Sequence, residues 1–201
     1  DMGGVVAEID RLIAEEIDLP AGYSIVFGGQ FESQQRAQHR LMIVVLLSLG
    51  LIFLLLYFAF RSVGQAFLIM SNVPLALIGG VVSLYVSGLY LSVPGSIGFI
   101  AVFGIAVLNG VVMVNAINQN IDGGMKQQQA VFEGAVSRLR PVLMTALTTV
   151  LGLAPLLYAT GVGSEVQRPL ATVVVGGLAS STFLTLVVLP ALYGFFSQKK
   201  R

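Results

Sequence analysis

The stretch GFIAVFGIAVLNGVVMVNAINQN occupies residues 98–120, inside a longer segment, residues 62–121, that has no charged side chain. It predicts a membrane-crossing helix, because about 20 helical residues span a hydrocarbon core of ~30 Å. Three asparagines interrupt it, at Asn109, Asn115 and Asn118. A side-chain amide in hydrocarbon costs free energy unless it finds a hydrogen-bond partner. The asparagines therefore predict a polar neighbour or a hydrated path beside this helix.

The composition of the whole chain also indicates a membrane protein. Its 201 residues are 56% hydrophobic and 10% charged, with a mean hydropathy of +0.88, which is far from the composition of soluble domains. The net charge of +1 and the lack of a basic stripe argue against nucleic-acid binding. With no cysteine and the single histidine His39, the sequence predicts no metal site and no catalytic residue in this chain.

Five apolar runs are long enough to cross a membrane, at residues 41–60, 63–86, 93–117, 141–160 and 169–196. They predict an all-α membrane domain of five transmembrane helices. We expect residues 125–140, in the one longer loop, to form a surface helix. Seven of the eight basic residues in the membrane loops and tail share one side: Arg61, Lys126, Arg138, Arg140, Lys199, Lys200 and Arg201. The positive-inside rule then predicts a cytoplasmic C-terminus, with residues 1–40 outside.

Residues 1–40 differ from the rest, since they hold seven of the ten acidic residues. Apolar residues recur at helical spacing from Val5 to Ile17, which predicts an amphipathic helix. Residues 23–30, YSIVFGGQ, follow as a short β-type run closed by two glycines. We expect this segment to be an α+β remnant of a water-soluble domain, joined to the first span by a polar helix. The chain, which opens on Asp1, is therefore expected to be a fragment of a longer protein.

Small and polar residues in the spans predict how the helices meet. Five small residues are expected to let helices pack closely, namely Gly104, Gly110, Gly176, Gly177 and Ser180. Thr148 and Thr149 are expected to bond to their own helix backbone, an option that Asn109 lacks. Arg138 lies about two turns before Thr145, so its side chain either reaches the bundle interior or anchors the helix at the cytoplasmic surface. The spans contain no Asp, Glu, Lys or His, so a proton-carrying carboxylate must come from elsewhere.

Three stretches resemble the C-terminal membrane half of resistance-nodulation-division (RND) efflux pumps. They are GFIAVFGIAVLNGVVMVNAIN at 98–118, RLRPVLMTAL at 138–147 and TGVGSEVQRPLATVVVGG at 160–177. The likeness covers essentially the whole chain and is nearest to heavy-metal pumps of the cobalt-zinc-cadmium and nickel type. It implies a proton-driven exporter of divalent metal cations in the bacterial inner membrane, not an enzyme, with no cofactor beyond the coupling protons.

The resemblance also implies partners. Such pumps are homotrimers of twelve-helix subunits, so the N-terminal half of the same polypeptide would complete this chain. Residues 1–40 would be the tail of a periplasmic porter subdomain. A periplasmic adaptor protein, an outer-membrane channel and membrane lipids would be the other partners.

Residue by residue, the resemblance implies a proton-coupling site. Essential acids on helix four of the family face helices ten and eleven, so Asn109 would lie opposite a carboxylate. Arg138 and Thr145 match an arginine and a threonine that assist proton coupling in the drug-exporting branch. The lysine of the drug-exporting branch corresponds to Leu108 in this sequence. The charge pair that this lysine usually forms therefore cannot form here.

The same comparison argues against copper or silver as the substrate. The glutamate, lysine and methionine of copper and silver pumps fall at Leu108, at Val142 and near Leu178. The methionines of the spans are then expected to be core residues and not soft-metal ligands, namely Met70, Met113 and Met144.

Two alternatives remain open at this point. A drug or amphiphile exporter of the same superfamily would carry a porter cleft lined by aromatic residues. A non-transporting membrane scaffold or protein-export accessory subunit would lack the paired acids on helix four.

Overall fold

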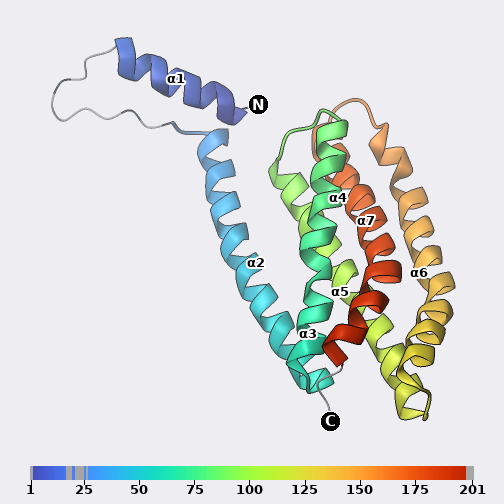
Figure 1. Ribbon diagram of the computed structural model, residues 1–201. Helices are drawn as coiled ribbons and strands as arrows, with labels where there is room; N and C mark the ends of the chain where they lie inside the picture. Colours follow the sequence, from blue (N-terminus) through green and yellow to red (C-terminus); the bar gives the residue numbers. More distant parts are fainter. Residues whose placement is uncertain (1, 17–19, 21–24, 26, 198–201) are drawn as a thin grey trace. The chain divides into compact units, whose positions relative to one another are not determined.

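The computed structural model describes residues 2–16, 20, 25 and 27–197, and these residues form helices joined by short turns (Figure 1). The helices are α1 (Met2–Glu16), α2 (Gln30–Phe60), α3 (Val63–Met70), α4 (Asn72–Val86), α5 (Val93–Asp122), α6 (Gln127–Leu157) and α7 (Ser164–Ser197). Five helical stretches are long and apolar enough to cross a membrane, at residues 32–60, 63–86, 93–122, 127–157 and 164–194. The prediction of an all-α domain with five such helices is therefore confirmed.

The α+β remnant is not seen in the residues that the structure describes. These residues include no strand, and positions 23, 24 and 26 of the expected β-type run lie outside them. The helical half of the expectation is confirmed, since α1 is an amphipathic helix with exposed Val5, Ile9 and Leu12 along its apolar face. An i,i+4 ion pair, Arg11 to Glu15 at 2.9 Å, lies on its charged face, where such pairs add little stability.

The chain divides into two compact units, residues 1–45 and 46–201. The second unit is a helical bundle in which α7 contacts α3, α4, α5 and α6 (Figure 1). One core cluster gathers Leu56 from α2 with residues of α3, α5 and α7 such as Ile69, Met113 and Leu189. A second cluster joins α4, α5 and α7 around Val102. Burying these apolar side chains against one another makes α7 the central helix of this unit.

The second span is broken into two helices at Ser71. Proline has no backbone N–H and its ring clashes with the carbonyl four residues earlier. Pro74 therefore cannot bond to Met70, which is where α3 ends. The Ser71 hydroxyl instead donates to the Leu68 carbonyl at 2.6 Å. Beyond the break, α3 contacts α5 and α7.

The segment expected to be a surface helix is continuous with α6. Pro141 lies inside α6 and does not begin it. The lower part of α6 packs closely on α5, because a Cβ added at Gly134 would lie 2.8 Å from Ile117 Cγ1. Asn120 Nδ2 also donates to the Ala130 carbonyl at 3.3 Å across the joint. These contacts hold residues 127–140 against α5, which explains why they do not form a separate helix.

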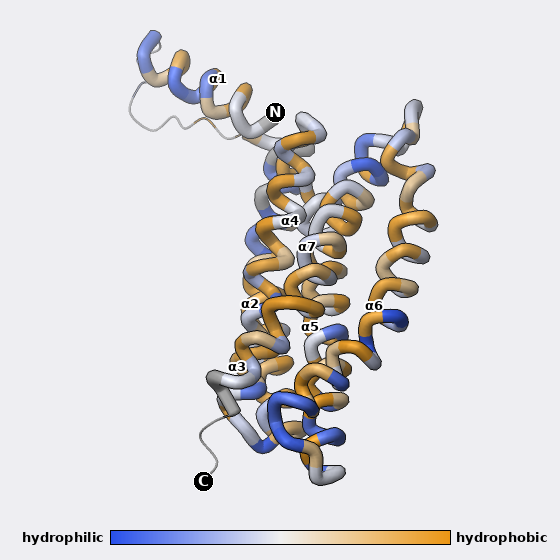
Figure 2. Tube along the Cα trace, turned by 45° about the vertical axis from the view of Figure 1, so that its right-hand side comes forward, coloured by the Kyte–Doolittle hydropathy of each residue, from blue (hydrophilic) through white to orange (hydrophobic). Residues whose placement is uncertain are grey.

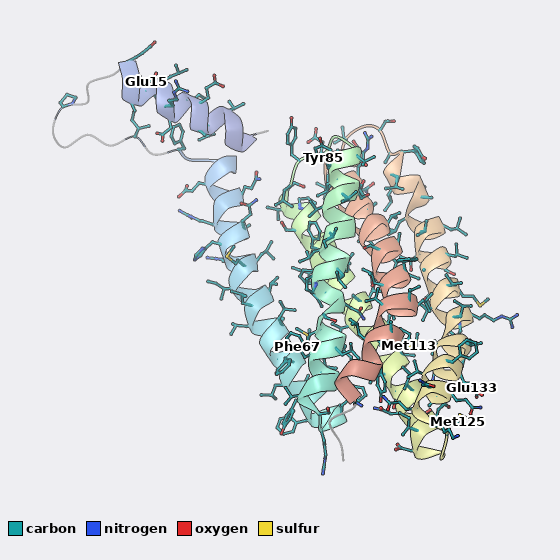
Figure 3. The ribbon with its side chains drawn as sticks, in the orientation of Figure 1. Glu15, Phe67, Tyr85, Met113, Met125 and Glu133 are labelled. Atoms are coloured by element: carbon teal, nitrogen blue, oxygen red, sulfur yellow. The ribbon has the colours of Figure 1, made fainter. Side chains whose placement is uncertain are left out.

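The two ends of the bundle differ chemically. Hydrophilic residues gather where α5 joins α6, while the middle of the helices is hydrophobic (Figure 2). Figure 3 shows Met125 and Glu133 at that end and Tyr85 at the other. Tyr85, Tyr90 and Tyr158 are 86%, 68% and 84% exposed. Exposed tyrosines at a helix end are typical of the interface between a membrane and water.

Candidate functional site

Helices α4 and α7 meet at their backbones. A Cβ added at Gly79 would lie 2.5 Å from the Gly176 carbonyl oxygen, and one at Gly176 would lie 2.7 Å from the Gly79 carbonyl oxygen. One turn away, the Ser83 hydroxyl donates to the Thr172 carbonyl at 3.0 Å. The two helices thus come close at Gly79 and Gly176, where neither backbone carries a side chain, which is typical of membrane helices that pack tightly.

The other predicted packing residues divide into two groups. A Cβ at Gly177 would lie 2.7 Å from Val102 and one at Gly110 would lie 3.0 Å from Asn72 Nδ2, so both glycines admit close neighbours. Ser180 donates to the Gly177 carbonyl at 3.0 Å and lies against Gly79. A Cβ at Gly104 would meet no described atom within 4 Å. A packing role for Gly104 therefore needs a neighbour from another segment.

A hydrogen-bonded cluster of Gln65, Asn118 and Tyr193 joins α3, α5 and α7 at one end. Gln65 Nε2 donates to Asn118 Oδ1 at 3.0 Å, and Asn118 Nδ2 donates back to Gln65 Oε1 at 3.1 Å. The Tyr193 hydroxyl donates to Asn118 Oδ1 at 2.5 Å, and Tyr193 is 1% exposed. This cluster explains Asn118. Gln65 and Tyr193 were not predicted as site residues, since each looks ordinary within its own helix.

The other two asparagines of the opening stretch differ from Asn118 and from each other. Asn115 is exposed on α5. Asn109 is 8% exposed, and its Nδ2 is buried with no hydrogen-bond partner among the described residues. The adjacent Leu108 is 60% exposed and lies on another face of α5. Asn109 therefore lies on the inner side of this chain's bundle.

The threonines and the arginine of α6 lie mostly at its surface. Thr148 and Thr149 donate to the carbonyls of Met144 and Thr145 at 2.7 and 2.8 Å, as predicted. Thr145, the predicted site residue, does the same to the Val142 carbonyl at 2.9 Å and is exposed. Arg138 is half-buried, and its Nε has no partner in the described part of the chain. The structure therefore does not bring Asn109, Arg138 and Thr145 into contact through any bond among these residues.

The described residues contain no group of three His, Cys, Asp or Glu side chains that could hold a metal ion. Of the methionines expected in the core, Met113 is fully buried and Met70 half-buried. Met144 is 62% exposed, so that expectation was wrong for Met144. The Met144 side chain lies on the exposed face of α6, away from the other helices of the bundle. The interior thus offers amide and hydroxyl groups, which can bind water or exchange hydrogen bonds but do not titrate near neutral pH.

Comparison with known proteins identifies the family. The profile of the AcrB/AcrD/AcrF family matches residues 1–197. The chain belongs to this family. The resemblance to RND efflux pumps is therefore confirmed.

Relatives place the chain near the heavy-metal pumps of that family. It is 49% identical over its full length to the nickel and cobalt resistance protein CnrA of Cupriavidus metallidurans, and 42% identical over 96% of its length to the cation efflux system protein CusA of Escherichia coli. A crystal structure of a heavy metal efflux pump matches 99% of this chain with 46% identity and a TM-score of 0.86. The chain spans only 19% of CnrA and 20% of that pump.

Proposed function

We propose that this chain is part of an inner-membrane transporter that exports divalent heavy-metal cations, driven by protons. The observation that carries the proposal is the match over almost the whole chain to pumps named for metal resistance. The five apolar helices fit the membrane domain of such a transporter. The proposed substrate is a nickel, cobalt, zinc or cadmium ion, after the names of CnrA and the cobalt-zinc-cadmium resistance protein CzcA.

The proposed proton-coupling residues are Asn109, Arg138 and Thr145, acting on carboxylates elsewhere in the polypeptide. The exposed face of α6 supports this placement for Thr145, because Leu147 and Leu151 on the same helix are each at least 60% exposed. Apolar faces of this kind meet either lipid or other helices. A neighbour on them would lie beside Thr145, which is exposed on the same helix.

The proposed assembly is a homotrimer in which the remainder of the polypeptide completes each subunit. A periplasmic adaptor and an outer-membrane channel would continue the export path. Residues 1–40 would lie in the periplasm, as part of a porter subdomain. Two findings support this proposed assembly. The chain belongs to the AcrB/AcrD/AcrF family, and it spans only a small share of the length of its relatives.

Uptake into inverted membrane vesicles tests the proposed function. Vesicles holding the full-length polypeptide should accumulate cobalt, nickel, zinc or cadmium when a proton gradient is imposed, and should lose this uptake when an uncoupler collapses the gradient. Vesicles without the protein serve as the control. Uptake of drugs but not metals, or uptake of neither at normal protein levels, would rule the proposal out in favour of a drug exporter or a scaffold.

We predict that the C-terminus of the chain is cytoplasmic. The cluster of Gln65, Asn118 and Tyr193 fixes the start of α3 and the ends of α5 and α7 at one end of the bundle, so Arg61 and Lys126 flank that same end. Basic residues favour the cytoplasmic side. A green fluorescent protein fused after residue 201 should therefore fluoresce, and an alkaline phosphatase fused there should be inactive. An active phosphatase would show the opposite orientation.

A further inference from the structure

Besides Arg138 Nε on α6, five side-chain polar atoms are buried without a hydrogen-bond partner among the described residues. They are Asn72 Nδ2 on α4, Asn109 Nδ2 on α5, and the hydroxyl oxygens of Ser181, Thr182 and Thr185 on α7. All five residues are at least nine-tenths buried, and Ser181 and Thr185 are 0% exposed. Burying a polar group without a hydrogen-bond partner lowers the free energy of unfolding, because the group loses its bonds to water. Five such groups would cost a large fraction of the stability of a typical domain. Each of these atoms therefore needs a partner.

The register of the helices places these atoms at one depth. On α5 and α7, Val102 lies against Gly177 and Asn118 is bonded to Tyr193. Both helices advance 16 residues between these two contacts, so they run side by side with a constant offset. Position 109 of α5 is then level with position 184 of α7.

Thr182 and Thr185 flank that level on α7. Asn72 reaches the same depth from α4, because a Cβ at Gly110, the neighbour of Asn109, would lie 3.0 Å from Asn72 Nδ2. Ser181 follows one residue before Thr182. We name these five residues, Asn72, Asn109, Ser181, Thr182 and Thr185, the polar layer.

The partners cannot be the ones that other hydroxyls of this chain use. Serine and threonine in helices commonly donate to a carbonyl one turn back, and Thr145, Thr148 and Ser180 do so. Ser181, beside Ser180, does not. The asparagine amides have no comparable local partner. Another polypeptide segment cannot approach atoms that this chain already encloses.

We propose that the polar layer is a binding site for internal water molecules, held between α4, α5 and α7 at mid-depth in the bundle. A buried water typically makes about three hydrogen bonds to otherwise unsatisfied groups. Two amides and three hydroxyls from three helices supply both donors and acceptors for such a cluster. The site rests on burial and hydrogen bonding alone and is independent of the proposed transport function.

The waters would let α4, α5 and α7 share polar contacts without direct side-chain bonds. A water can exchange partners when helices shift, whereas a direct amide bond has to break. The layer lies between the apolar Val102 cluster and the cluster of Gln65, Asn118 and Tyr193. Apolar packing thus borders the polar layer on one side, and the hydrogen-bonded cluster borders it on the other.

Radiolytic labelling of Met113 tests the water site in the full-length polypeptide in lipid nanodiscs. Met113 lies one turn from Asn109 on α5 and is 0% exposed (Figure 3), so hydroxyl radicals can oxidise its sulfur only if they form from water beside it. We expect rapid labelling of Met113 in the unaltered protein. Thr185→Val should reduce it several-fold, because the isosteric valine cannot bind water.

Thr149→Val is the matched control, since the Thr149 hydroxyl already donates to its own helix, and it should leave the labelling of Met113 unchanged. A cryo-electron microscopy map that resolves other internal waters should also show density within hydrogen-bond distance of Thr185 and Asn109. This second measurement decides the question if the Thr185 variant does not accumulate. Negligible labelling of Met113 in the unaltered protein, an equal rate in Thr185→Val, or an empty polar layer in that map would overturn the proposal.

Discussion

Replacing Gly176 with leucine is expected to prevent the membrane domain from accumulating as a folded protein. Any side chain at this position meets the Gly79 carbonyl oxygen, because the first atom alone would lie 2.7 Å from it. A backbone atom cannot rotate away as a side chain does, so α4 and α7 have to separate. That separation would also break the Ser83 bond to Thr172 and open the Val102 cluster.

Gly176→Ala is expected to destabilise the membrane domain less than Gly176→Leu does. Alanine is the better helix former by about 1 kcal/mol, yet overpacking a well-packed site costs about 1–3 kcal/mol. We expect a net loss of stability, seen as a lower midpoint in thermal unfolding of the detergent-solubilised full-length polypeptide. Gly152→Ala is the control, since a Cβ there meets nothing within 4 Å, and it should be neutral or stabilising. A Gly176→Leu protein with normal yield and midpoint would disprove the backbone contact.

The number of spans and the packing surface of α7 could be predicted from sequence because both depend on local spacing. Runs of apolar residues define the spans, and the small residues at positions 176 and 180 fall on one side of α7 whatever lies opposite. The opposing residue, Gly79, could not be predicted, since nothing in either helix specifies its partner. The break at Ser71 was predictable in principle, because Pro74 removes the bond to Met70.

The candidate site was harder to predict, because polar residues act through long-range pairs. Asn118 was expected to have a polar neighbour, but the neighbours lie far along the chain: Gln65 is 53 positions away and Tyr193 is 75 positions away. A single polar residue in an apolar span signals that a partner exists but not which one. Conversely, Thr145 was singled out by resemblance, while its described hydrogen bond is of the same local kind as those of its neighbours. The proposed proton-coupling role therefore depends on groups outside this chain.

Asn109→Leu is expected to reduce proton-driven export strongly while leaving the protein folded. Polar contacts between membrane helices contribute only about 0.6 kcal/mol on average, so the protein level and the proposed trimer should change little. If the amide donates to a proton-carrying carboxylate, through a water of the polar layer, it favours the charged form of that acid. Its loss should then raise the pKa of the carboxylate and move the pH optimum of export upward. If the pKa of the carboxylate rises by one unit, the export rate should fall about tenfold at a pH where the rate depends steeply on pH.

The measurement is proton-gradient-driven metal uptake into inverted vesicles across a range of pH, at matched protein levels. Arg138→Ala and Thr145→Val should also lose transport while remaining trimeric, if these residues assist coupling as proposed. Thr149→Val should transport normally, because Thr149 has the same kind of local hydrogen bond as Thr145 but is not a proposed coupling residue. The upward displacement of the optimum separates a coupling role from a packing role, since a packing defect lowers uptake equally at every pH. Normal uptake with an unchanged pH profile in Asn109→Leu would make Asn109 a packing residue, whose amide serves only the polar layer between α4, α5 and α7.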